Sequence, residues 1–198
     1  MVNYRITAED NIAAGGAKTK AKQNIAAIKV LKTLEIEQRQ ATAEEQAQLI
    51  SYSGWGAAPD IFTGKTEWAK LQDELKSLLN EAEFEAARSS TLNAHYTTPA
   101  VVSEIYAGLE RLGFNGGRIL DPSMGASGIF EGVMPEATAQ ASDITGIELD
   151  SISGRIATYL YPDSTVHVNG FQDVDLPDDY FDLSISNVPF SQIGVVDP

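Results

Sequence analysis

The segment with the clearest chemical potential is residues 186–190, Ser-Asn-Val-Pro-Phe. It follows an apolar run, residues 180–186, that predicts a buried strand. The side chain of Asn187 offers an acceptor and two donors, Pro189 stiffens the turn, and Phe190 has a flat face for stacking. These groups are suited to hold a planar group that bears an amine, such as adenine. The alternative interpretation is an ordinary Asn-x-Pro turn at the end of a strand.

Three more predicted strands, 118–121, 144–149 and 165–169, are each followed by residues with polar or aromatic side chains. The residues at these strand ends are Asp121, Glu148, Phe171, Gln172 and Asp173. In an open parallel sheet, ligands bind outside the carboxyl ends of the strands. The sequence therefore predicts that these side chains and Asn187 gather around one crevice.

The small-residue loop 121–128 and Glu148 form a pair with a familiar spacing. Backbone amides near the start of a helix suit an anion, and an acidic side chain about 20 residues later can accept hydrogen bonds from ribose hydroxyls. We therefore expect a cofactor that carries adenosine. The alternative is an ordinary strand–helix loop with a surface glutamate. A phosphate loop with Gly-Lys-Ser/Thr is absent, and so is a strict Gly-x-Gly-x-x-Gly.

Composition limits the classes of protein to consider. The 198 residues include no Cys, which excludes disulfides, thiolate metal sites and a cysteine nucleophile. The two histidines, His95 and His167, do not suggest a metal site. No apolar run reaches the length of a membrane span, so we expect a cytoplasmic protein without membrane contact. The formal net charge of −14 would repel nucleic acid, so DNA would have to be held by another segment.

The pattern of apolar residues changes near residue 90. Residues 1–90 predict helices over 17–37, 42–52 and 67–87, with Thr42 and Thr66 as N-caps. Residues 91–198 alternate strands and helices, with helices beginning at Thr98-Pro99 and at Asp150. We therefore expect an α/β protein: a helical N-terminal region followed by a Rossmann-like domain with a parallel sheet flanked by helices.

Four segments, taken in order, resemble a known family. They are residues 93–99, Asn-Ala-His-Tyr-Thr-Thr-Pro; 120–130, Leu-Asp-Pro-Ser-Met-Gly-Ala-Ser-Gly-Ile-Phe; 146–150, Gly-Ile-Glu-Leu-Asp; and 187–190, Asn-Val-Pro-Phe. This set is similar to the S-adenosylmethionine-dependent, adenine-specific DNA methyltransferases, and most of all to the methylase part of large methylase–helicase proteins of phages and plasmids. The resemblance covers about residues 90–198 and implies a methyltransferase fold that is incomplete in this chain.

The resemblance also implies roles for single residues. Asn187 and the carbonyl of Val188 would accept hydrogen bonds from the exocyclic amine of the target base, with Pro189 in the turn and Phe190 stacked on the flipped-out base. The residues implied to bind S-adenosylmethionine are Tyr96, Thr97, Thr98, Asp121, Pro122, Ser123, Gly125, Glu148, Leu149, Phe171 and Gln172. Glu148 would hold the ribose, and Phe171 or Gln172 would lie by the adenine.

The chain ends soon after Phe190, which leads us to expect that its sheet is completed by further C-terminal sequence, a partner chain or self-association. Two alternatives to a DNA methyltransferase stay open. One is a degenerate methyltransferase fold that serves as an interaction protein, such as an acidic DNA mimic that counters restriction. The other is a methyltransferase for a protein glutamine or an RNA amine.

Overall fold

The computed structural model describes residues 2–10, 12, 14–92 and 97–188. Its centre is a parallel sheet of four strands: β1 (Arg118–Asp121), β2 (Asp143–Ile147), β3 (Thr165–His167) and β4 (Leu183–Ser184). The strand order is β3-β2-β1-β4. This order begins the Rossmann-type pattern, in which the chain moves outward from the first strand and then returns to its other side. The expected Rossmann-like α/β fold is thereby confirmed.

The strands lie where the apolar runs predicted them, but three are shorter. The second and third end at Ile147 and His167, and the fourth pairs only over Leu183–Ser184. The register is anchored in the core, where Ile119 lies between Ile144 of β2 and Leu183 of β4.

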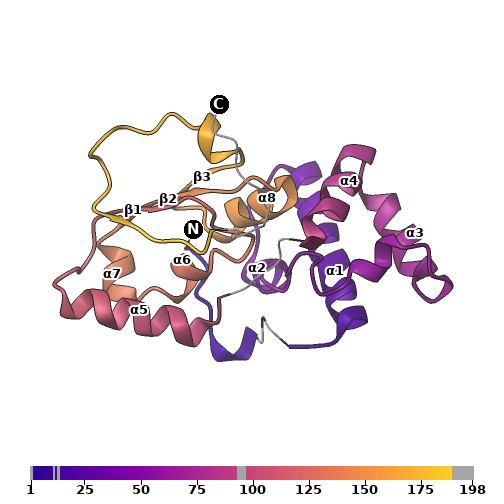
Figure 1. Ribbon diagram of the computed structural model, residues 1–198, viewed down its shortest axis with the longest axis horizontal. Helices are drawn as coiled ribbons and strands as arrows, with labels where there is room; N and C mark the ends of the chain where they lie inside the picture. The colour runs from indigo at the N-terminus through magenta and orange to yellow at the C-terminus, as the bar shows by residue number, and fades with distance from the viewer. Residues whose placement is uncertain (1, 11, 13, 93–96, 189–198) are drawn as a thin grey trace.

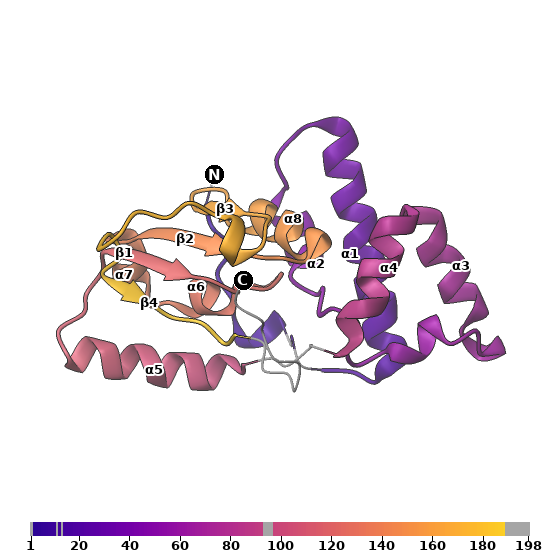
Figure 2. The same ribbon diagram turned by 45° about the horizontal axis from the view of Figure 1, so that its top comes forward.

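Three helices, α5 (Pro99–Arg111), α6 (Ile129–Val133) and α7 (Glu136–Gln140), lie beside the sheet (Figure 1). A compact apolar cluster joins α5 and α6 to β1 and β2. Its buried members are Val102, Tyr106, Ile119, Phe130, Met134 and Ile144. Helix α8 (Ser151–Leu160) lies between the sheet and the N-terminal helices (Figure 2).

The N-terminal helices are α1 (Ala17–Glu37), α2 (Ala43–Leu49), α3 (Ala69–Leu78) and α4 (Glu81–Ser89). Short 3₁₀ helices cover Ala8–Asp10, Pro59–Phe62, Thr66–Trp68, Ser90–Leu92 and Phe171–Asp173. Helix α1 matches the predicted 17–37 span, and the apolar residues that gave the prediction, such as Ile28 and Leu31, are fully buried. Helix α1 packs against α2 and α3, which makes it the centre of this helical group.

One hydrophobic core runs from the N-terminal helices into the sheet part. It includes Ile28 and Leu31 of α1 together with Ile156 and Leu160 of α8. The N-terminal segment also contacts α8, because the amide of Tyr4 donates to the carbonyl of Leu160 at 2.8 Å. The two parts therefore pack against each other through a shared core, and the expected boundary near residue 90 stays a prediction.

Capping residues fix several helix starts. Thr42 accepts from the amide of Glu45 and forms the expected capping box, and Asp150 accepts from the amide of Ser153. Thr98 is the residue before α5, as predicted, but its side chain makes no capping bond.

The prediction of one helix over 67–87 with Thr66 as its N-cap is wrong. Thr66 starts a 3₁₀ turn instead, and the helical stretch is interrupted at Leu79, whose backbone is extended. Asn80 then caps α4 with a capping box to Glu83. The apolar spacing continues across the break, so periodicity alone did not show it, whereas the Asn80–Glu83 pair is a helix-start signal.

Among the described residues, no helix combines the length and the apolar character needed to cross a bilayer.

Candidate functional site

A cavity of about 470 Å³ lies at the carboxyl ends of β1 and β2. One side consists of residues from the loop after β1 and from the segment after β2, including Gly125 and Glu148. The other side comes from the N-terminal region, including Trp55 of the loop after α2 and Ser89 of α4. The volume falls within the range of sites for small molecules and cofactors.

Glycines shape the loop between β1 and α6. Gly125 has φ +66° and Gly128 has φ +48°, a left-handed conformation that other residues rarely adopt. A Cβ on Gly128 would lie 2.4 Å from the ring of Tyr161. The loop is also tied to β2, because the amide of Met124 donates to the carbonyl of Ile147 at 3.0 Å. The loop is thus held against the strand edge with its small residues beside the cavity.

Glu148 links this loop to the segment after β2. Its Oε2 accepts from the amide of Gly125 at 2.8 Å, and its Oε1 accepts from the amide of Asp150 at 2.7 Å. Burial raises the pKa of the carboxyl to about 7, although both backbone hydrogen bonds act to lower it. A carboxylate has about four acceptor positions, so Glu148 keeps capacity for hydroxyl donors of a ligand in the cavity.

Asp121 is buried and is not among the residues that line the cavity. It is 5% exposed, and its Oδ1 accepts from Ser186 Oγ at 2.7 Å and from the amide of Ser123 at 3.1 Å. Burial raises its pKa to about 6, and these two hydrogen bonds oppose that shift. The carboxylate therefore connects the glycine loop to the residue directly before Asn187.

The structure brings part of the predicted site together. The predicted site residues that line the cavity are Thr97, Ser123, Gly125, Glu148, Leu149, Asn187 and Val188. Asn187 is half-buried and Val188 is 54% exposed. Tyr96, Pro189 and Phe190 lie outside the described residues, so their roles stay predictions.

Five predicted residues do not line the cavity, namely Thr98, Asp121, Pro122, Phe171 and Gln172. Thr98 is exposed at the start of α5. Phe171 and Gln172 lie in a 3₁₀ turn on the surface, where Phe171 is 52% exposed and Gln172 bonds Asp173 at 2.9 Å. Both side chains are exposed there, and their predicted place beside an adenine stays a prediction.

The helical side of the cavity was not predicted. Tyr52, Gly54, Trp55, Ala86, Ser89 and Ser90 contribute to it. The Gly-Trp-Gly sequence at 54–56 is typical of a loop with an unusual backbone, in which Trp55 can serve as an anchor or as a stacking surface. The structure favours the anchor, because Trp55 is fully buried and packs edge-on against Phe62 with ring centroids 5.5 Å apart.

Among the described residues, no group of three or more His, Asp or Glu side chains is arranged to hold a metal ion. The site is thus defined by a parallel sheet, a glycine loop, an acidic residue after the second strand and an amide side chain after the fourth. These features define a Rossmann-like α/β protein with a small-molecule cavity at the carboxyl edge of its sheet.

The chain is similar to one curated protein and, at lower identity, to two solved structures. No family model matches the chain. The Defense against restriction protein B of Escherichia phage P1 is 30% identical over 135 residues, which are 67% of this chain and 6% of the phage protein. The chain thus corresponds to a small part of that relative.

Two solved structures are similar at lower identity. One is a putative class I S-adenosylmethionine-dependent methyltransferase from Listeria monocytogenes, with 16% identity and a TM-score of 0.38 over 87% of this chain and 60% of that chain. The other is a type I restriction-modification methyltransferase subunit from Streptococcus thermophilus, with 18% identity and a TM-score of 0.42 over 96% of this chain and 46% of that chain.

Proposed function

We propose that this chain is the N-terminal part of a DNA methyltransferase that transfers a methyl group from S-adenosylmethionine to the exocyclic amine of adenine. The observation that carries the proposal is the cavity itself. It joins Glu148 and the glycine loop, the groups expected for an adenosine cofactor, to Asn187, the group expected for the amine.

The residues around the cavity fit this cofactor in size and chemistry. The volume of about 470 Å³ suits a nucleoside with an attached amino acid. Glu148 is the acidic acceptor for ribose hydroxyls, and Ser123 and Gly125 line the cavity where main-chain atoms can approach a ligand. Bound there, S-adenosylmethionine would supply an electrophilic methyl group.

The chain's own residues would act by binding and orientation. The side-chain oxygen of Asn187 and the carbonyl of Val188 accept hydrogen bonds from the amine of the target base and direct its lone pair. The Asp121–Ser186 hydrogen bond holds the segment that carries Asn187. Alignment of the reacting groups supplies the rate enhancement, so a covalent enzyme nucleophile is not needed.

Calorimetric titration of the chain with S-adenosylmethionine tests the cofactor assignment. We expect wild-type binding and an affinity roughly tenfold lower or worse in Glu148→Ala, since about 1.4 kcal/mol corresponds to a factor of ten. The affinity of Glu148→Gln should fall between those of the wild type and Glu148→Ala, because glutamine keeps one acceptor oxygen. Glu136→Ala on the exposed side of α7 is the matched control, because Glu136 does not line the cavity. A folded wild-type chain that does not bind the cofactor would contradict the proposal.

We propose further that DNA is held by sequence outside this chain. The net charge of −14 opposes contact with a phosphate backbone, and the aligned region is 6% of the phage relative. Within the described residues, β4 pairs with β1 alone, and Val101 and Ile105 of α5 are exposed. We expect this chain to show no measurable retardation of duplex DNA, and a longer protein that includes following sequence to bind it.

A second function is favoured by one observation: the phage relative is named as a defence against restriction. In this alternative the acidic chain binds a restriction enzyme in place of DNA. Adding the chain to a restriction digest measures this directly. Protection that persists in Glu148→Ala and needs no cofactor would favour the alternative, and unchanged cleavage at high concentration of the chain would exclude it.

A further inference from the structure

The cavity has a wall that no sequence motif of a methyltransferase accounts for. Tyr52, Gly54 and Trp55 lie in the loop after α2, and Ala86 and Ser89 lie in α4. All five line the same cavity as Glu148. A ligand held by Glu148 therefore has the N-terminal helices as its other boundary.

The loop of this wall is held by a buried side chain of α1. Asn24 is fully buried, its Nδ2 donates to the carbonyl of Gly54 at 2.6 Å, and its Oδ1 accepts from the amide of Ser53 at 2.8 Å. A buried amide that bonds a loop in both directions fixes the position of that loop. The wall is thus rigidly joined to α1.

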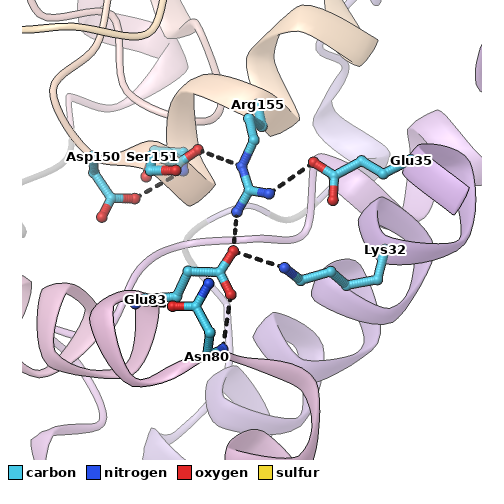
Figure 3. Close-up of polar contacts among 8 residues, drawn as sticks. Lys32, Glu35, Asn80, Glu83, Asp150, Ser151 and Arg155 are labelled. Carbon is cyan, nitrogen blue, oxygen red and sulfur yellow. Dashed lines mark hydrogen bonds and ion pairs between the residues drawn. The ribbon is translucent and has the colours of Figure 1, made fainter.

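An ion-pair network joins Lys32 and Glu35 of α1 and Glu83 of α4 to Arg155 of α8 (Figure 3). Arg155 of α8 contacts Glu83 of α4 at 2.5 Å and Glu35 of α1 at 2.8 Å, and Lys32 of α1 contacts the same Glu83 oxygen at 2.7 Å. The side chain of Glu83 is 11% exposed, so solvent screens the network less than a surface pair. Its hydrogen bonds to Lys32, Asn80 and Arg155 lower the pKa of Glu83 against the effect of burial, and the carboxylate stays charged.

The position of Arg155 matters for the site. It is the single Lys or Arg in residues 119–198, which are otherwise acidic. Its Nε also donates to the carbonyl of Ser151, in the first turn after Glu148 and Asp150. The Arg155 guanidinium thus bonds the first turn of α8, beside the cavity, and also α1 and α4. Helix α4 carries part of the opposite wall, and α1 holds the loop that forms the rest. Arginine suits this role because its planar group serves several acceptors at fixed angles.

We propose that the N-terminal helices form a wall of the ligand pocket and that Arg155 is the positioning residue that holds this wall against the Glu148 side. The identity of the ligand rests on the proposed function above, whereas the role of Arg155 rests on the contacts alone. Without Arg155, Glu83 keeps Lys32, but the bond between α4 and α8 is lost.

Hydrogen exchange of the ligand-free chain tests the positioning role. In Arg155→Met, we expect amides of residues 50–58 and 81–90 to exchange roughly tenfold faster or more, while amides of α5 keep their wild-type rates. Arg155→Lys should restore part of the protection, since it can bond one carboxylate. The control is Arg39→Met, which removes an arginine paired with Glu37 and Glu45 away from the cavity. Unchanged exchange at 81–90 in Arg155→Met would overturn the proposal.

One further variant and one further measurement separate the possible outcomes. Glu35→Gln removes one arm of the network and should show a smaller increase in exchange, which covers the case in which Arg155→Met does not fold. Titration with S-adenosylmethionine should then show weaker binding in Arg155→Met than in Arg39→Met. If the wild-type chain does not bind the cofactor and exchange still rises at 81–90, the cofactor assignment fails and the role of Arg155 stands. Equal cofactor affinity in both variants would show that the wall is not part of the pocket.

Discussion

At the scale of single residues, the site depends on buried acids whose hydrogen bonds go to the backbone and to serine. Glu148 is bonded to two amides, and Asp121 to one amide and one hydroxyl. Burial raises the pKa of both carboxyls, and the hydrogen bonds limit that rise. Each acid therefore holds one segment of the cavity edge in place, although burial disfavours its charged form.

Ser186→Ala tests the link between Asp121 and the segment of Asn187. Loss of the 2.7 Å bond should raise the pKa of Asp121 further and lower the free energy of unfolding by about 1–2 kcal/mol at pH 7. NMR titration of the carboxyl and urea unfolding measure the two effects. Ser184→Ala is the matched control, since Ser184 is exposed on β4. Equal stability of the two variants would show that the Asp121 bond contributes nothing.

At the scale of elements, the sequence predicted what depends on local signals. The apolar spacing of α1, the capping box at Thr42 and the run at 118–121 correspond to elements in the structure. The break at Leu79 was missed because the apolar spacing continues through it. The 3₁₀ turn at Phe171–Asp173 was not predicted, because spacing from a strand does not fix the backbone or the direction of the side chains that follow it.

The part of the site that sequence reasoning missed depends on contacts between distant segments. Residues 52–55 and 86–90 join the cavity only because α1 and α4 pack near α8, through Arg155 and a shared core. The Gly-Trp-Gly sequence marks a special loop, but no motif within either segment shows that the two segments meet at the cavity.

Asn80→Ala tests the capping box that separates α4 from α3. We expect a loss of about 1 kcal/mol in the free energy of unfolding, because the amide of Glu83 loses its acceptor. Thr98→Ala is the control: Thr98 holds the same position before α5 but makes no capping bond, so its loss should stay within about 0.5 kcal/mol. Thermal unfolding of both variants measures the difference. A larger loss in Thr98→Ala would contradict the assignment of the caps.

At the scale of the whole molecule, Glu131 lies where three distant segments meet. Its Oε1 accepts from Asn3 Nδ2 at 3.0 Å and from the hydroxyl of Ser164, while α6 carries its backbone. Its Oε2 is buried without a partner among the described residues. Burial raises the pKa of this carboxyl to about 8. The protonated form is therefore the one that suits the junction at neutral pH.

The sign of the resulting pH dependence follows from the direction of the shift. An acid whose pKa is higher in the folded state than its ordinary 4.5 binds more protons when folded, so the free energy of unfolding falls as the pH rises from about 4.5 to about 8. Asp121 and Glu148 add to this fall over the lower part of the range. Glu131→Gln removes the charge but keeps an oxygen acceptor for Asn3 and Ser164. At pH 9 we expect the variant to be more stable than the wild type by roughly 2 kcal/mol.

At pH 5 the two proteins should be nearly equal, because Glu131 is then protonated in the folded wild type. Urea unfolding at pH 5, 7 and 9 gives the comparison, with Glu136→Gln on exposed α7 as the control for loss of a carboxylate. A variant that is less stable than the wild type at every pH would mean that the charged carboxylate is favoured at this junction. The N-terminal segment would then be held by an ionic contact with Glu131 instead of by neutral hydrogen bonds.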